Sequence, residues 1–297
     1  MNKKCAGLFG SSRWLIERDA AHVLAQKLES MTPEALQAAE AAAATYARSS
    51  EPTLIGAVAV IPVVGPIFYK PSWYAMYFGG AILTTIRAQF RTALNDPNVT
   101  AIVFPFDSPG GIIDMVPEFA KELFAARGKK PMIAVADTMI ASAAYWLAAQ
   151  VDQIYVSETS RLGSVGVYCE HEDISAMLER VGVKVTLIAY GEHKVDGNPY
   201  EPLSAAAREK IQGDVDRAGE KFTLAAARGR GVTKKVVLDT FGQGQVFDGE
   251  VAVSLGMADK IGTIDQVLMK TTRGRSGAVA AVVPPVAIVV QTEVVEA

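Results

Sequence analysis

Two residues of this chain, Ser142 and Lys194, lie in local sequences that suit a site for cleaving amide bonds. Ser142 follows a short β-rich run and opens the small-residue stretch ASAAYWLAA, so we expect it near the N-terminus of a helix. Lys194 follows the run VTLIAY and lies in a loop that begins with a glycine. A serine hydroxyl becomes nucleophilic when a base takes its proton, and a lysine amine shielded from water can be that base. If the two side chains meet, the pair predicts a Ser-Lys hydrolase.

Two glycine-rich turns could supply the other groups that such a site needs. The turn Pro109-Gly110-Gly111 follows the apolar run TAIVFPF, and glycine lets a substrate approach backbone N–H groups that can hold an oxyanion. Ser164 lies in the glycine-flanked stretch LGSVGV, where its hydroxyl could orient a buried amine. Each feature also has a structural explanation: a tight turn, a helix cap at Ser142 or a solvated lysine.

His193 raises a rival interpretation, because it precedes Lys194 directly. A Ser-His-Asp triad would use His193 as base, with Asp107, Asp137 or Asp196 as its third member. Neighbouring residues of an extended segment point to opposite faces, so at most one of the two can be the base. The residue types alone leave both alternatives open.

Composition and charge exclude several other classes of function. The chain has 297 residues, of which 50% are hydrophobic and 21% charged, as in a globular protein. Its net charge of -3 offers no basic face, so we expect no nucleic-acid partner. The three histidines, His22, His171 and His193, lack metal-ligand spacing, and we expect neither a metal nor another cofactor.

The sequence also bears on location. Cys5 and Cys169 lie far apart, which favours two free thiols in a reducing compartment. The basic start MNKK is followed by no apolar run long enough for a signal peptide. Since no apolar stretch reaches the roughly 18 residues that cross a membrane, we expect a soluble protein of the cytoplasm without a membrane partner.

The pattern of elements predicts an α/β fold with a largely parallel sheet, preceded by a helical extension. Residues 1–52 form the extension, with helices before and after Met31, and residues 53–272 the main domain, which opens with the β-branched run TLIGAVAVIPVVGPIF. Residues 273–297 are a low-complexity tail. Within the main domain we predict helices at 75–95, 115–127, 142–150, 172–181 and 204–228, and strands at 100–106, 131–136, 153–157 and 183–190.

Five motifs in this order resemble peptidase family S49, the signal peptide peptidase A group. They are SPGG, ASAAYWLAA, LGSVGV, GEHKVDGNPY and GQVFDGEVAVSLGMADKIG, spread over residues 53 to about 265. The resemblance implies a ClpP/crotonase-type fold of repeated ββα units. The stretch HKVDGNPY is most similar to the bacteriophage capsid-assembly branch, whose members process scaffold or capsid proteins during head maturation.

The resemblance also implies roles for single residues. Ser142 matches the family's nucleophile, Lys194 its general base and Ser164 the hydroxyl that positions the lysine. The matching oxyanion donors are the N–H groups of Gly110, Gly111 and Ala143. Many members have glycine after the nucleophile where this chain has Ala143 and Ala144, whose methyl groups could narrow the oxyanion hole.

The resemblance implies partners and a location as well. The substrate would be a scaffold or capsid protein, the enzyme a homo-oligomeric ring, and the location the host cytoplasm or the procapsid. Cellular members carry a membrane anchor where this chain has its helical extension, which favours an assembly role. Three alternatives stay open: a peptidase of the same family that degrades signal or membrane peptides, a crotonase-like acyl-CoA enzyme, and a catalytically idle capsid component.

Overall fold

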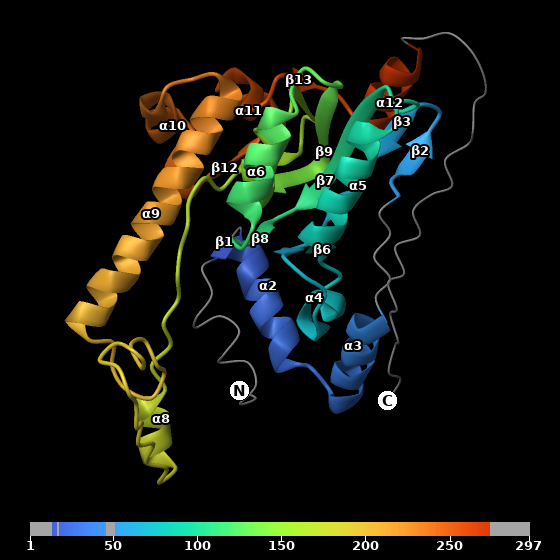
Figure 1. Cartoon of the computed structure of the whole chain (residues 1–297). Coiled ribbons are helices and arrows are strands. Elements are labelled where there is room, and N and C mark those ends of the chain that lie inside the picture. Colours follow the sequence, from blue (N-terminus) through green and yellow to red (C-terminus); the bar gives the residue numbers. More distant parts are fainter. Residues whose placement is uncertain (1–13, 17, 46–50, 274–297) are drawn as a thin grey trace.

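The computed structural model describes residues 14–16, 18–45 and 51–273 as two sheets surrounded by helices (Figure 1). The tail predicted at 273–297 lies outside the described residues beyond Arg273. The larger sheet contains β2 (Thr53–Ile55), β3 (Val58–Val60), β4 (Val63–Val64), β7 (Ala101–Ser108), β9 (Met132–Ala141), β10 (Gln153–Val156), β11 (Arg161–Gly163), β12 (Val246–Asp248) and β13 (Lys260–Ile261). The smaller sheet has the strand order β1 (Trp14–Ile16), β8 (Gly110–Ile112), β5 (Ile67–Phe68) and β6 (Ala81–Ile82).

The larger sheet is mostly parallel, as predicted. Its central strands β3, β7, β9 and β11 run in one direction, and only the outer strands β2 and β12 pair in antiparallel fashion. The predicted strands at 100–106, 131–136 and 153–157 correspond to β7, β9 and β10, and β9 extends further, to Ala141. The α/β fold class is therefore confirmed.

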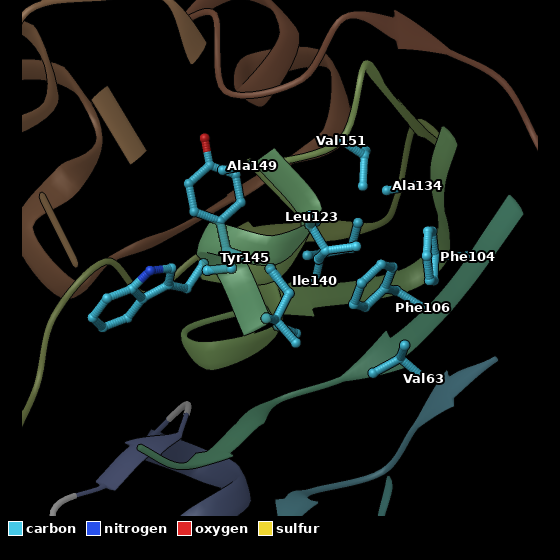
Figure 2. Close-up of a cluster of buried hydrophobic side chains, with 14 of the residues drawn as sticks. Val63, Phe104, Phe106, Leu123, Ala134, Ile140, Tyr145, Ala149 and Val151 are labelled. Carbon is cyan, nitrogen blue, oxygen red and sulfur yellow. The ribbon is translucent and has the colours of Figure 1, made fainter. Parts of the chain in front are cut away.

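Helices cover the sheets and connect their strands. Those of the main domain are α4 (Trp73–Tyr77), α5 (Leu83–Asn95), α6 (Val116–Ala125), α7 (Ala143–Ala148), α8 (Ser175–Arg180), α9 (Ala205–Arg230), α10 (Lys234–Thr240), α11 (Gly249–Ser254) and α12 (Ile264–Arg273), with a short 3-10 turn at Gly242–Gly244. The core lies between the larger sheet and the helices α6 and α7. Figure 2 shows part of it, including Phe104, Phe106, Leu123, Ile140 and Tyr145. This packing buries α7 completely.

The helical extension forms as predicted, with α2 (Arg18–Glu29) before Met31 and α3 (Pro33–Thr45) after it. Thr32 caps α3, since its side-chain oxygen accepts a hydrogen bond from the N–H of Ala35 at 3.2 Å. The extension packs on the smaller sheet through a cluster that includes Ile16, Leu24 and Phe68. The strand β1 was not predicted from the sequence, and it pairs with β8 of that sheet directly before α2.

The helix predicted at 75–95 is interrupted, and the structure has α4, β6 and α5 in its place. Gly79 and Gly80 cause the break. Gly79 adopts a left-handed conformation with φ 65°. At Gly80 an added Cβ would lie 2.4 Å from the ring of Phe68, so the chain approaches that ring too closely for a side chain.

The prediction of a strand at residues 183–190 is wrong. These residues form no regular structure and lie in an arm, residues 171–204, that holds α8 and projects beside α9 away from both sheets (Figure 1). The β-branched residues there have strand propensity, but a strand needs a neighbour to receive its backbone hydrogen bonds. Within the described chain none is in place, and Ile188 is 97% exposed.

Candidate active site

The carboxyl ends of three neighbouring strands bring most of the predicted site together. Ser108 at the end of β7 pairs with Ile140 of β9, and Ala141 of β9 pairs with Gly163 of β11. The next residues along each strand are therefore the Pro-Gly-Gly turn, Ser142 and Ser164. These strand ends meet at one edge of the sheet, which is where ligands bind in open parallel sheets.

Ser142 is held in a strained conformation at this edge, with φ 53° and ψ -117°. Two backbone hydrogen bonds fix it there: its N–H donates to the carbonyl of Gly163 at 2.8 Å, and its carbonyl accepts from the N–H of Trp146 at 2.9 Å. Such a backbone conformation costs about 1–3 kcal/mol in a residue other than glycine, and it clusters at functional sites. The predicted place of Ser142 at the start of a helix, here α7, is confirmed.

The Ser142 hydroxyl has no hydrogen-bond partner among the described residues, although the residue is only 1% exposed. A buried hydroxyl without a partner is uncommon, because it has lost its water and gained nothing in exchange. Ser142 has no side-chain capping bond to α7, so it is not a helix cap of the ordinary kind. Its neighbours Ala141, Ala143 and Ala144 are fully buried, and their side chains have no polar atom that could form a hydrogen bond with the hydroxyl.

Ser164 lies on a similar turn beside Ser142. It has φ 54°, is 8% exposed, and donates its N–H to the carbonyl of Gln245 at 2.6 Å. Gly163 before it has φ 134°, and an added Cβ would lie 2.5 Å from the same Gln245 oxygen. The turn therefore admits only glycine at this position. The structure thus brings the two predicted serines onto adjacent strand ends.

The Pro-Gly-Gly turn differs in part from the prediction of free backbone N–H groups. Both glycines belong to strand β8, and the N–H of Gly110 lies 3.3 Å from the Oγ of Ser108. Gly111 pairs with Leu15 of β1 and with Ile67 of β5. The turn still lies next to the predicted nucleophile, since β8 packs against α7. The N–H of Ala143 is in the first turn of α7, where amides lack an intrahelical acceptor.

The helix α7 is held in place by several residues that were not selected from the sequence. The guanidinium of Arg127 donates to the carbonyls of Gln150 at 2.8 Å and Gly229 at 2.8 Å, and to those of Ala149 and Val151. Gln150 is fully buried and bonds to the carbonyl of Trp146 at 3.1 Å. Arg127 lies in the stretch ARGKK, which is typical of an exposed turn, so no local signal could have identified it.

Aromatic contacts complete the setting of this helix. Trp146 stacks on Phe222 of α9 with ring centroids 4.6 Å apart. Tyr145 is fully buried and donates its hydroxyl to the carbonyl of Met257 at 3.1 Å, and burial raises the pKa of that hydroxyl. Tyr145 therefore stays neutral and structural, while the buried α7 has little freedom to move Ser142.

Lys194 is not brought to Ser142 within this chain. It lies exposed in the arm, in a turn in which its N–H donates to the carbonyl of Gly191 at 3.2 Å. The arm is held to itself, because the N–H of Ile174 donates to the carbonyl of Pro199 at 2.9 Å. The predicted nucleophile and the predicted base thus lie in separate parts of the molecule.

The residues of the rival triad are not assembled around Ser142 either. His193 pairs with Asp196 at 3.0 Å, but both lie on the arm. The carboxylate of Asp137 accepts from the N–H of Ile264 at 3.0 Å, while Asp107 belongs to strand β7, where its backbone carbonyl accepts from the N–H of Gly65 at 2.8 Å. The Asp137 carboxylate therefore has a structural partner.

Neither a metal cluster nor a membrane span is found within residues 14–16, 18–45 and 51–273. No group of three or more His, Cys, Asp or Glu side chains there could hold a metal ion. No helix in the same ranges is long and apolar enough to cross a membrane. The thiol of Cys169 lies 3.9 Å from the backbone carbonyl oxygen of Glu170.

The fold and the site together define an α/β protein with a strained, buried serine at the end of a parallel strand. Residues 125–276, about half of the chain, match peptidase family S49, and the chain belongs to this family. The match includes Ser142, Ser164 and Lys194. The predicted family is therefore confirmed, and with it the ClpP/crotonase-like fold class.

Proteins of bacteriophages and of bacteria are similar to this chain. The chain is 35% identical over 208 residues to Capsid assembly protease C of Escherichia phage lambda, covering 70% of this chain and 47% of that protein. It is 32% identical over 208 residues to Head-tail preconnector protein GP5 of Enterobacteria phage P21, covering 70% and 41%. Protease 4 of Salmonella typhi is 29% identical over 187 residues, covering 63% and 30%. The chain spans less than half the length of each.

Proposed function

We propose that this chain is a serine endopeptidase that uses Ser142 as nucleophile, with residues 53–272 as its peptidase unit. The observation that carries the proposal is the buried, strained Ser142, whose hydroxyl has no partner among the described residues. A hydroxyl prepared in this way lacks only a base and a substrate. Membership of peptidase family S49 supports the same reaction.

In the proposed reaction the neutral amine of Lys194 takes the proton of Ser142 as the Oγ bonds to the substrate carbonyl carbon. The oxyanion accepts hydrogen bonds from the N–H groups of Ala143 and of the Gly110-Gly111 turn. The lysine then protonates the leaving amine, and the C–N bond breaks. Water then attacks the acyl carbon and loses a proton to the same amine. The C–O bond to Ser142 breaks as the lysine returns this proton to Oγ, which releases the second product. Ser164 would orient the lysine.

The Lys194 of one chain lies away from the Ser142 of the same chain. We propose that the arm of a second copy places its Lys194 at this serine. The arm carries large apolar side chains at high exposure, among them Val181 at 67%, Ile188 at 97% and Tyr190 at 102%. Apolar surface of this kind marks an interface. Burying the arm against a neighbouring copy would also desolvate the amine and so favour its neutral form.

We propose scaffold or capsid proteins of a phage head as substrates. The support is the similarity to Capsid assembly protease C of Escherichia phage lambda over 70% of this chain. A crotonase-like acyl-CoA reaction has less support, since Ser142 lies where such an enzyme needs a carboxylate.

The test incubates the wild type, Ser142→Ala and Lys194→Ala with a scaffold-type protein and identifies fragments by mass spectrometry. Both variants should lose cleavage. Lys184→Ala is the matched control, because Lys184 is also exposed on the arm. Cleavage by either variant at the wild-type rate would refute the dyad, and a thermal shift with coenzyme A would favour the acyl-CoA alternative.

A further inference from the structure

Strand β1 occupies an edge of β8 that lies next to the nucleophile. Trp14, Leu15 and Ile16 pair in antiparallel register with Ile112, Gly111 and Gly110. Figure 1 shows β1 beside β8, at the start of α2. β8 is the strand of the Gly110-Gly111 turn, and it packs against α7, which begins after Ser142. The N-terminal segment therefore lies along the backbone that a substrate has to approach.

A peptide substrate needs an edge of β8. To place a carbonyl carbon at Ser142 and its oxygen on the amides of this turn, the peptide has to run alongside residues 110–112. An extended peptide binds such a strand by adding to its edge through main-chain hydrogen bonds. In the described structure both edges of β8 are taken, one by β1 and the other by β5.

The β1 side can open without disturbing the core between the larger sheet and α7, because Ile16 of β1 belongs instead to the separate small cluster with Leu24 and Phe68. At the β5 side, an added Cβ on Gly111 would lie 2.0 Å from the carbonyl oxygen of Ile67, so the two backbones are in close contact. Ile67 is fully buried. β1, in contrast, is three residues long and is an edge strand of its sheet. Short edge strands are the elements that exchange most readily for another chain.

We infer that β1 is an inhibitory strand that occupies the binding place of an extended peptide substrate and has to leave before cleavage. The inference rests on the proposed function, because it concerns the same site. It assigns the segment Trp14–Ile16 to control of substrate access, and it makes the N-terminal extension part of the catalytic cycle. As an intramolecular competitor, β1 acts at an effective concentration of about millimolar.

A reversible disulfide tests this in the full chain. Trp14 and Ile112 are direct register partners, and Cα atoms opposite each other on antiparallel strands are close enough for a disulfide. The variant Trp14→Cys with Ile112→Cys is made with Cys5→Ser and Cys169→Ser, so that no other thiol competes. Oxidation pins β1 to β8, and dithiothreitol releases it. The single variant Trp14→Cys, treated identically, controls for the reagents.

Two readouts are compared in the oxidised and reduced states of the same protein. One is cleavage of a scaffold-type protein, and the other is labelling of Ser142 by a small fluorophosphonate that needs no strand pairing. We expect oxidation to slow cleavage at least about tenfold while labelling continues at a similar rate. Because Ile112 lies in the strand that the peptide would pair with, the oxidised state is compared with the reduced state of the same variant and not with the wild type.

The outcomes separate the two claims. Equal cleavage before and after reduction, with Ser142 labelled in both states, overturns the inhibitory strand and leaves the serine peptidase standing. Absence of both cleavage and labelling in the reduced and wild-type proteins overturns the proposed function, and the inhibitory strand with it. Cleavage that survives in the reduced protein after Ser142→Ala also overturns both.

Discussion

The sheet edge that carries Ser142 and the arm that carries Lys194 differ in what fixes a side chain in place. At the sheet edge, Ser142 and Ser164 are each tied by backbone hydrogen bonds to a neighbouring strand or loop, and α7 is wholly buried. In the arm, Lys194 is exposed and the surrounding apolar residues face solvent. One half of the proposed dyad is therefore held in place by the chain's own core. We propose that the other half is held by the surface of a second copy.

The strongest test of this comparison mixes two inactive proteins. Ser142→Ala and Lys194→Ala should each lower kcat by at least about 10³-fold, since residues that act as a unit fail together. If the arm of one copy serves the sheet edge of another, unfolding and refolding the two variants together should restore cleavage, as measured by release of scaffold fragments. Mixing Ser142→Ala with the double variant is the control, and no recovery in the first mixture would place the dyad within one chain.

Glycine substitutions should show the difference in rigidity. Gly163→Ala should lower the free energy of unfolding by about 3 kcal/mol, because φ is 134° and the new methyl group would lie 2.5 Å from a backbone oxygen. Gly182→Ala in the arm has φ 72° but no atom within 4 Å, and should cost only about 1 kcal/mol. Urea unfolding of both variants measures the contrast, and equal losses would contradict it.

Ser164→Ala tests whether the second serine at the sheet edge orients the lysine. If Ser164 only orients the lysine, its loss should lower kcat about 10²-fold through misplacement of the base, with little change in melting temperature. Ser254→Ala provides a matched control, because that exposed hydroxyl bonds locally to the carbonyl of Val251 at 2.7 Å. A wild-type kcat for Ser164→Ala would remove this residue from the mechanism.

A further prediction concerns the C-terminal end of α9, at the far end of this helix from the arm. Arg230 at the end of α9 pairs with Asp259 at 2.7 Å, and Asp259 also accepts from the N–H of Ile154. Burial opposes the charge of Asp259, but the Arg230 hydrogen bond prevails and lowers the pKa of this carboxyl. The pair therefore stabilises the fold above the unfolded pKa of about 4, and this contribution is lost as pH falls through the lower folded value.

Asp259→Asn tests that contribution. At pH 7 it should lower the free energy of unfolding by about 2 kcal/mol, the range of a hydrogen bond to a charged group. In acid, where the wild-type carboxyl also becomes protonated, the difference between the two proteins should shrink. Urea unfolding at neutral and acidic pH measures it, and a constant difference would show that charge is not the cause.

The sheet edge could be predicted from sequence because its signals are local and its geometry general. Ser142, Ser164 and the glycine turn each follow a β-rich run, and the ends of parallel strands meet. The structures of the arm and of β1 could not be predicted from sequence. The stretch 183–190 has strand propensity, but pairing depends on a partner that sequence does not show. β1 is too short for any period, and its place is set by β8, which comes almost a hundred residues later.

The stacking of Trp146 on Phe222 fixes α9 near its C-terminal half, so a small change in helix direction there displaces its N-terminal end by a larger distance. Phe222 lies about 25 Å along the helix from Ala205, at 1.5 Å per residue, and the lysine-bearing loop lies beyond that end. A change of about 5° in helix direction at this fulcrum would move the far end by about 2 Å, enough to decide whether a proton can be transferred. Because Trp146 lies one turn after Ser142, this one contact joins the helix that follows the proposed nucleophile to the helix that follows the arm with the proposed base.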